Sequence, residues 1–126
     1  MPEDKLNFLI VDDIIINRML LKEITKEFAY SFTEAKNGKE AINILKENDI
    51  DLILMDIEMP VMNGVETTKY IRSELDYPKN KTPIIAITAH NPDDFFEDYN
   101  NAGFNELLTK PYSFNKIRRI LKKINL

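Results

Sequence analysis

The chain of 126 residues contains no cysteine. Disulfides, thiolate chemistry and cysteine-based zinc sites are therefore excluded, which suits a reducing cytosol. Its apolar runs are only a few residues long, too short to cross a bilayer, and residues 1–4 lack the apolar region of a signal peptide. We therefore expect a soluble cytoplasmic protein.

The 21 acidic residues outnumber the 17 Lys and Arg residues, so the formal net charge is −4 at pH 7. A general nucleic-acid binder usually carries a basic face, so this function is not expected. The length and the 44% hydrophobic content suffice for one core and leave no room for a second domain of ordinary size. Repeats, low-complexity tracts and linkers are absent. We expect one domain over residues 1–126.

Short apolar runs alternate along the chain with longer segments of helical period. This alternation is typical of a parallel sheet covered by helices on both faces. The expected strands are residues 8–11, 30–35, 52–55, 84–87 and 107–108. The second run mixes polar and apolar residues, which places it at a sheet edge. The predicted fold class is α/β, a doubly wound parallel sheet built from five strand–helix units.

Five helices are expected to follow these strands. The first covers residues 16–28, and its predicted buried face consists of Leu20, Leu21, Ile24 and Phe28. The second and third follow Asn37-Gly38 and Asn63-Gly64, and the second buries Ala41, Ile42 and Leu45. The fourth starts at Asn91-Pro92, where Asn can cap the helix and Pro fits its first turn, and it ends at Gly103. The fifth starts at Ser113 and buries Ile117, Ile120, Leu121 and Ile124.

Polar residues follow four of the expected strands at the point where each strand ends. They are Asp12 and Asp13 after the first strand, Asp56 after the third, Thr88 after the fourth and, beyond Thr109, Lys110 after the fifth. In an open α/β sheet, ligands bind at the carboxyl ends of the strands, near the point where the strand order reverses. We therefore expect three carboxylates, a hydroxyl and an ammonium group to meet at one place.

This set of groups favours phosphoryl transfer to an aspartate. Crowded carboxylates repel one another, and without a cation at least one of their pKa values should rise. Mg²⁺ prefers oxygen ligands, would remove the conflict, and would keep Asp56 ionised as a nucleophile. Lys110 can contact one phosphoryl oxygen as a point charge while the Thr88 hydroxyl donates to another. Each residue taken singly also fits an ordinary loop or strand position, so the prediction depends on their combination.

The segments around these residues resemble the receiver domains of two-component response regulators, over essentially the whole chain. The matching segments are residues 9–13 with Asn17-Arg18, Asn37-Gly38, 51–64, 83–89, Ala102-Gly103 and Lys110-Pro111. The run from Asp51 to Gly64 is highly specific by itself. The resemblance implies the flavodoxin-like strand order 2-1-3-4-5. Residues 59–64 and 85–89 are similar to receivers attached to hybrid histidine kinases.

The resemblance also implies roles for the site residues. Asp56 would accept a phosphoryl group from a phosphohistidine. Asp13 would bind Mg²⁺ directly, Asp12 directly or through water, and Glu58 through its backbone carbonyl.

On the far side of the phosphoryl group, Thr88 would move toward it and Lys110 would contact it. The Lys110–Pro111 peptide bond is expected to be cis, a state that only proline makes accessible at low cost.

By the same resemblance, the phosphoryl donor would be a sensor histidine kinase or a histidine phosphotransfer protein. A downstream protein would bind the face formed by the fourth and fifth helices. No nucleic acid or membrane partner is expected. The chain would be no conventional enzyme, since it would promote only its own phosphorylation and dephosphorylation. It ends soon after the fifth helix, so no separate output domain is expected within it.

Two positions bear on the conformational change that phosphorylation would cause. Many receivers carry Tyr or Phe three residues before the lysine, whereas this chain has Leu107. We expect the phosphoryl site to be retained. Phosphorylation should cause only a modest rearrangement around the fourth helix, and partner selection should rely on that helix, with Phe95, Phe96 and Tyr99. His90, the only histidine, is expected to be a solvated loop residue. With a single histidine, the chain cannot also hold a histidine-kinase dimerisation module.

Three other classes of protein fit these residues less well. A haloacid-dehalogenase-type phosphatase would need a D-x-D motif after its first strand, which Asp12-Asp13-Ile14 lacks. A flavodoxin-like electron carrier would need a phosphate-cradling loop there, and the two aspartates would repel the FMN phosphate. A degenerate receiver that acts only as an interaction module would not need the intact set of five site residues, and a phosphorylation assay separates it from an active one.

Overall fold

The computed structural model describes residues 6–89 and 102–126. A five-stranded sheet forms its centre, with the strand order β2-β1-β3-β4-β5 and every pair parallel. The strands are β1 Leu6–Val11, β2 Ala29–Ala35, β3 Leu52–Asp56, β4 Ile84–Thr88 and β5 Glu106–Thr109. The predicted fold class and strand order are confirmed, and β2 lies at an edge, as its mixed composition predicted.

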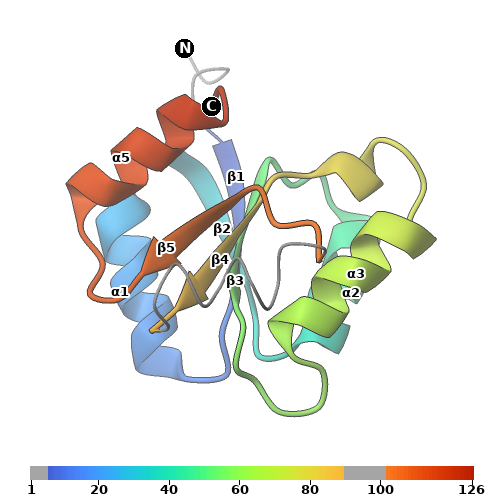
Figure 1. Ribbon diagram of the computed structural model, residues 1–126. Helices are drawn as coiled ribbons and strands as arrows, with labels where there is room; N and C mark the ends of the chain where they lie inside the picture. The colour runs from blue at the N-terminus through green and yellow to red at the C-terminus, as the bar shows by residue number, and fades with distance from the viewer. Residues whose placement is uncertain (1–5, 90–101) are drawn as a thin grey trace.

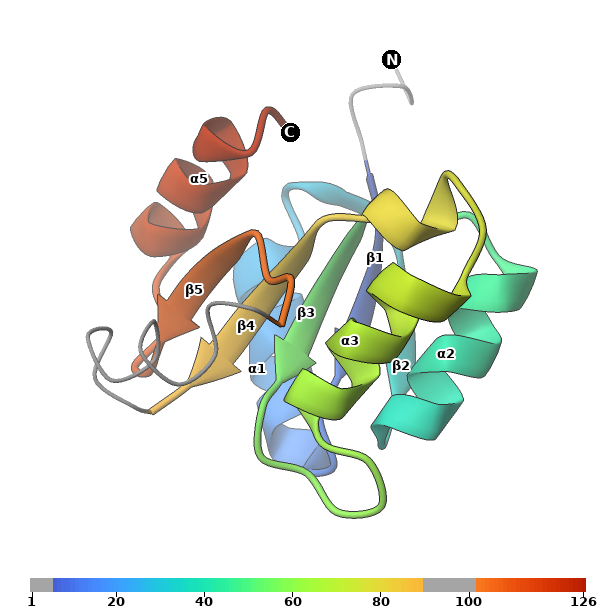
Figure 2. The same ribbon diagram turned by 45° about the vertical axis from the view of Figure 1, so that its right-hand side comes forward.

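Helices cover both faces of this sheet. They are α1 Ile15–Thr25, α2 Gly38–Glu47, α3 Gly64–Glu74 and α5 Phe114–Lys123, with a short 3₁₀ helix, η2, at Lys79–Lys81. α1 and α5 lie on one face, and α2 and α3 lie on the other (Figures 1 and 2). None of the described helices is long and apolar enough to cross a membrane. The helix expected from Asn91 falls almost wholly outside the described residues, as do His90, Phe95, Phe96 and Tyr99.

The core consists of two apolar layers, one on each side of the sheet. Successive strand residues point to opposite faces. In β1, Phe8 and Ile10 therefore pack with Leu21 of α1 and with the buried face of α5, whereas Leu9 and Val11 pack with residues of α2 and α3. Every residue of β3 and β4 is buried. Coverage on both faces is the reason that these strands appear in the sequence as unbroken apolar runs.

Three helices begin at side-chain caps, close to the helix starts that were predicted. The side chain of Asn37 accepts a hydrogen bond from the backbone of Glu40 at the start of α2, and Ser113 plays the same role at the start of α5. Asn63 and Glu66 form a reciprocal capping box at the start of α3. Each such cap typically stabilises the folded state by about 1 kcal/mol.

The first helix differs from the prediction in its extent and in its buried face. It was predicted over residues 16–28 but ends at Thr25, before the turn that leads into β2. Leu21 is fully buried, and Ile24 is half-buried, as expected. The prediction was wrong for Leu20, which is 46% exposed. It lies at the border between the inward face and an outward face that is itself apolar, so hydrophobicity alone did not place it.

Candidate functional site

Three carboxylates meet at the carboxyl ends of β1 and β3. Asp12 and Asp13 directly follow β1, and Asp56 is the last residue of β3. β1 and β3 are paired neighbours, so their ends lie side by side. Each of the three aspartates offers an oxygen within 4.8 Å of the other two. Asp12 and Asp56 are buried and Asp13 is exposed, so the cluster is reached from the Asp13 side.

The two oxygens of Asp12 have different surroundings. Oδ1 accepts a hydrogen bond from the Ile14 backbone N–H at 2.9 Å and one from the Asn17 amide at 3.5 Å. Oδ2 is buried and has no hydrogen-bond partner in the structure. Burying a carboxylate oxygen without a partner is costly. A cation bound beside Oδ2 would remove that cost.

Arg18 holds the main chain of the loop between β1 and α1 in place. Its Nη1 donates to the Asp12 carbonyl oxygen at 2.8 Å, and its Nε pairs with Glu34 of β2 at 2.9 Å. Glu34 also pairs with Lys22, at 3.1 Å. This buried guanidinium therefore ties the β1–α1 loop to both α1 and β2. The sequence prediction assigned Arg18 no role, although a cation three residues before the core residue Leu21 was an available signal.

The loop after β3 is shaped around Asp56. Asp56 Oδ1 accepts from the Glu58 backbone N–H at 3.2 Å. The Gly64 N–H donates to the Ile57 carbonyl at 2.9 Å, which brings the start of α3 back to the end of β3. A Cβ on Gly64 would collide with the main chain of Asp56 and Ile57, so this close approach requires glycine. The proposed metal contact of the Glu58 carbonyl stays a prediction.

The hydroxyl and the ammonium group come from the next two strands. Thr88 ends β4, is 2% exposed and is the register partner of Thr109 in β5. The Lys110 N–H donates to the Thr88 carbonyl at 3.0 Å, which holds the ends of β4 and β5 together. The Lys110–Pro111 bond is cis, as expected. The charge of Lys110 acts on Asp12 and Asp56, where it lowers both pKa values.

Burial dominates the electrostatics of the cluster. It raises the pKa of Asp56 to about 6, and the charges of Asp12 and Asp13 add to this rise, whereas Lys110 and the Glu58 N–H oppose it. Burial also raises the pKa of Asp12, against the lowering effects of the Ile14 N–H, Asn17 and Lys110. The raised pKa of at least one carboxylate was expected, although burial contributes more to it than the repulsion from which it was predicted.

Tyr112 is a second residue that the sequence prediction missed. Its hydroxyl is buried and has no hydrogen-bond partner in the structure. Burial raises the pKa of Tyr112, and the charges of Asp12 and Asp56 raise it further, so the ring lies near the acidic cluster. Its only sequence signal was its position two residues after Lys110.

The donor set fits a hard divalent cation. Carboxylate oxygens are the ligands that Mg²⁺ prefers, and a site built from a few carboxylates leaves positions for water. Asp12, Asp13 and Asp56 are the residues that would hold it, and the unpartnered Asp12 Oδ2 is the atom with the clearest need of a ligand.

The fold and this acidic cluster together define a signalling domain of the two-component type. The chain belongs to the response regulator receiver domain family, whose model matches residues 8–122.

Two solved structures and one curated protein illustrate the similarity. The receiver domain of the sensor histidine kinase PA1611 from Pseudomonas aeruginosa, solved with a magnesium ion coordinated in the active site cleft, is 29% identical, with a TM-score of 0.83 over 94% of this chain and 96% of that one. The co-crystal structure of the Saccharomyces cerevisiae histidine phosphotransfer protein Ypd1 with the receiver domain of Ssk1 matches at 34% identity and a TM-score of 0.80, over 94% of this chain and 88% of the matched one. The aerobic respiration control sensor protein ArcB of Escherichia coli is 32% identical over 124 residues, which are 98% of this chain and only 16% of ArcB.

Proposed function

We propose that this chain is the phosphoacceptor switch of a two-component phosphorelay. Asp56 accepts a phosphoryl group from a phosphohistidine, and Mg²⁺ is held by Asp12, Asp13, Asp56 and the backbone carbonyl of Glu58. The observation that carries the proposal is the position of Asp56, a buried carboxylate that closes β3 within 4.8 Å of two others. The family match and the magnesium ion in the PA1611 receiver support it.

In the proposed reaction, an oxygen of Asp56 attacks the phosphorus atom, and the bond from phosphorus to the partner's histidine nitrogen breaks. Mg²⁺, when bound, neutralises charge on the carboxylates and on the phosphoryl group. The Thr88 hydroxyl donates a hydrogen bond to one phosphoryl oxygen, and the Lys110 ammonium group holds another. The same groups would assist hydrolysis, so the chain acts only on its own phosphoryl group.

The direct test is phosphorylation of the whole chain by acetyl phosphate, followed by intact mass spectrometry. We expect one phosphoryl group per chain in the presence of Mg²⁺ and none after chelation with EDTA. A chain that gains no phosphoryl group with Mg²⁺ present would be an interaction module and would contradict the proposal.

Asp13→Asn should weaken Mg²⁺ binding. Loss of even an outer-shell partner typically costs 10–100-fold in metal affinity, so we expect a loss of at least about tenfold for a direct ligand, with slower phosphorylation. Asp13 is exposed, so the fold should be unchanged. Titration followed by NMR measures the affinity. Asp49→Asn, which removes an exposed carboxylate elsewhere, is the control with the same charge change. Equal affinity in wild type and Asp13→Asn would exclude this role.

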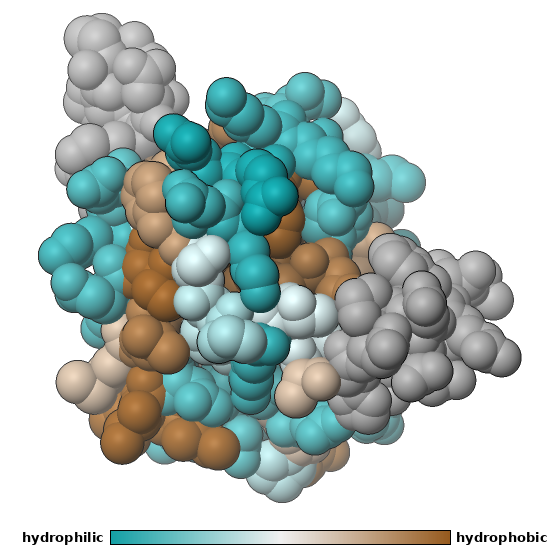
Figure 3. Space-filling view, turned by 60° about the vertical axis from the view of Figure 1, so that its left-hand side comes forward, coloured by the Kyte–Doolittle hydropathy of each residue, from teal (hydrophilic) through white to brown (hydrophobic). Residues whose placement is uncertain are grey.

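The proposed phosphoryl donor is a sensor histidine kinase or a histidine phosphotransfer protein, and the first two turns of α1 support a protein donor. Their outward face is apolar and adjoins the acidic cluster. With Ile14, which immediately precedes the helix, it consists of Ile15, Ile16, Met19 and Leu20, and these side chains are 46–71% exposed. Figure 3 shows a hydrophobic strip along this side of the molecule. Contiguous exposed apolar surface of this kind marks interaction sites. A protein that brings a phosphohistidine to Asp56 has to cover the rim of the site, and α1 forms part of that rim.

Met19→Asp should therefore slow transfer from a protein donor without affecting a small one. We expect the rate from a phosphorylated histidine phosphotransfer protein that labels the wild-type chain to fall by about tenfold, equivalent to about 1.4 kcal/mol, which is more than most interface residues cost when they are replaced. The rate with acetyl phosphate should not change.

Tyr77→Asp is the matched control for Met19→Asp, because Tyr77 is 80% exposed and lies near η2, away from α1. It should leave both rates unchanged. Equal slowing of both donors by Met19→Asp would mean that the substitution disturbs the site itself, and no slowing with either donor would exclude α1 as the docking face.

A downstream partner is proposed to bind the face that includes α5. The relatives leave that partner's identity open, but the charge and shape of the α5 surface restrict its chemistry.

A further inference from the structure

Positive charge is concentrated on α5 in a chain whose net charge is −4. Five of the ten helix residues are Lys or Arg, and none is acidic. The helix dipole favours Lys122 and Lys123 in the last turn, but it gives no such benefit to Lys116 in the first turn or to Arg119 in the middle. The helix dipole therefore does not account for the positions of these two cations.

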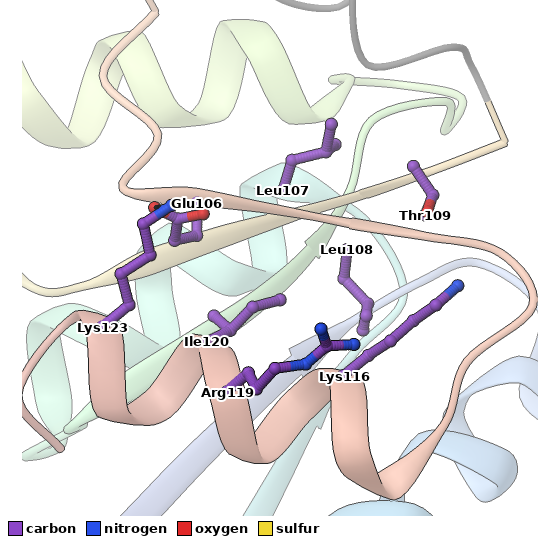
Figure 4. Close-up of a pocket in the computed structure, with 8 residues that line it drawn as sticks. All are labelled: Glu106, Leu107, Leu108, Thr109, Lys116, Arg119, Ile120 and Lys123. Carbon is purple, nitrogen blue, oxygen red and sulfur yellow. Dashed lines mark ion pairs between the residues drawn. The ribbon is translucent and has the colours of Figure 1, made fainter.

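Three of the cations border a groove between α5 and β5. Lys116, Arg119 and Lys123 are spaced three and four residues apart, which places them on one side of the helix. The groove has a volume of about 320 Å³, and Leu108 and Ile120 are among the apolar residues that line it. Figure 4 shows these two side chains in the space between β5 and α5, with the three cations leaving α5 on the side that faces β5.

The cations along the groove can pair with carboxylates of a ligand. Lys123 pairs with Glu106 at 3.3 Å, and Lys116 donates to the Pro111 carbonyl at 3.0 Å. Lys123 is exposed, so its ion pair contributes little and can exchange for another carboxylate. Arg119 is exposed and makes no hydrogen bond or ion pair with the described residues. A guanidinium group is suited to bidentate recognition of a carboxylate.

The wall opposite the cations is an edge strand. β5 is last in the sheet order and pairs only with β4 among the described strands. An edge strand presents backbone donors and acceptors that another extended segment can use. Because side chains alternate along a strand, every second side chain of such a segment would face α5 and its cations.

We propose that the groove between β5 and α5 docks an acidic, extended segment of a partner protein, which adds to the edge of β5. Its carboxylates, at every second position, pair with Arg119, Lys123 and Lys116, and its backbone bonds to β5. Docking needs no phosphoryl group, so this inference goes beyond the proposed phosphoacceptor function. The backbone donors and acceptors on the edge of β5 favour a peptide over a nucleic acid, whose backbone has no N–H groups to pair with them.

The test uses the full chain and a fluorescein-labelled peptide of four Glu-Val repeats. Binding is measured by fluorescence anisotropy, and the contact surface is mapped by NMR. We expect the amide signals of residues 106–109 and 119–123 to shift. Arg119→Glu should weaken binding by about tenfold, equivalent to about 1.4 kcal/mol. Asp56→Asn should bind as wild type does, which separates this result from any failure of phosphorylation.

Arg118→Glu is the matched control, because it makes the same charge change one residue away on a different side of α5. It should leave binding nearly unchanged. Equal weakening by both substitutions would mean non-specific charge attraction and would overturn the proposal. A peptide with four Glu followed by four Val that binds equally well would exclude strand addition. A short DNA duplex that binds more tightly than the peptide, and whose binding is weakened by Arg119→Glu, would assign the groove to nucleic acid instead.

Discussion

Asp56→Asn is expected to gain no phosphoryl group from acetyl phosphate and Mg²⁺, under conditions in which the wild-type chain gains one. The asparagine amide is neutral and a poor nucleophile, so it cannot form the acyl phosphate. The substitution keeps the size of the side chain and can still accept the Glu58 N–H bond, so the loop after β3 should keep its shape. Intact mass spectrometry measures the outcome.

Asp49→Asn is the control for the phosphoryl site, because it removes one exposed carboxylate at a distance from the cluster. This variant should be labelled as fully as the wild type. Asp56→Asn labelled to the same extent would contradict the site assignment, and tandem mass spectrometry would then show whether Asp13 or another carboxylate carries the group.

The metal-free chain should lose stability, relative to Asp56→Asn, as the pH rises from about 4 to about 6. Burial and neighbouring charges raise the pKa of Asp56 from 3.8 to about 6 in the folded state. The unfolded chain therefore releases this proton first as the pH rises. The stabilising contribution of the protonated Asp56 carboxyl is complete below the pKa that this group has in the unfolded chain. It is lost as the pH rises through the pKa that the group has in the folded chain. The shift of about two pH units corresponds to about 3 kcal/mol.

Urea unfolding of both proteins in EDTA, at several pH values between 4 and 7.5, measures this difference. The comparison with Asp56→Asn is needed because Glu34, paired with Arg18, has a lowered pKa and contributes the opposite trend. Mg²⁺ should restore most of the lost stability near pH 7, since it binds the folded state. If the free energies of unfolding of the two proteins in EDTA changed with pH in parallel, the ionised form of Asp56 would not be destabilised by its surroundings.

Some features of the fold are local, and for these the residue pattern was sufficient. The unbroken apolar runs of β3 and β4 predicted strands buried on both faces. Asn37-Gly38, Asn63-Gly64 and Ser113 predicted helix starts, and the structure shows Asn37, Asn63 and Ser113 as caps that bond to the backbone only a few residues away. The place of each strand end also predicted which polar groups meet, once the sheet was taken to be parallel.

The strand order could not be predicted from the residue pattern alone. Alternating strands and helices predicted a parallel sheet, but the order 2-1-3-4-5 came from the resemblance to receivers. Many orders bury the same apolar surface, so periodicity alone does not choose between them. The metal contact of Glu58 has the same origin. The roles of Thr88 and Lys110 came from the chemistry of the groups at the strand ends, and all three roles remain predictions.

The sequence by itself therefore determined the class of fold, the helix starts and the acidic residues that cluster, because these depend on local pattern and on strand ends. Only the tertiary structure decided which face of α1 is buried, since this helix is apolar on more than one side and packing selects Leu21 over Leu20. It also decided that Arg18 reaches Glu34, sixteen residues away, and that the Tyr112 hydroxyl is buried near Asp12. The raised pKa of Asp56 likewise depends on burial and on charges brought from other strands, and these exist only once the chain has folded.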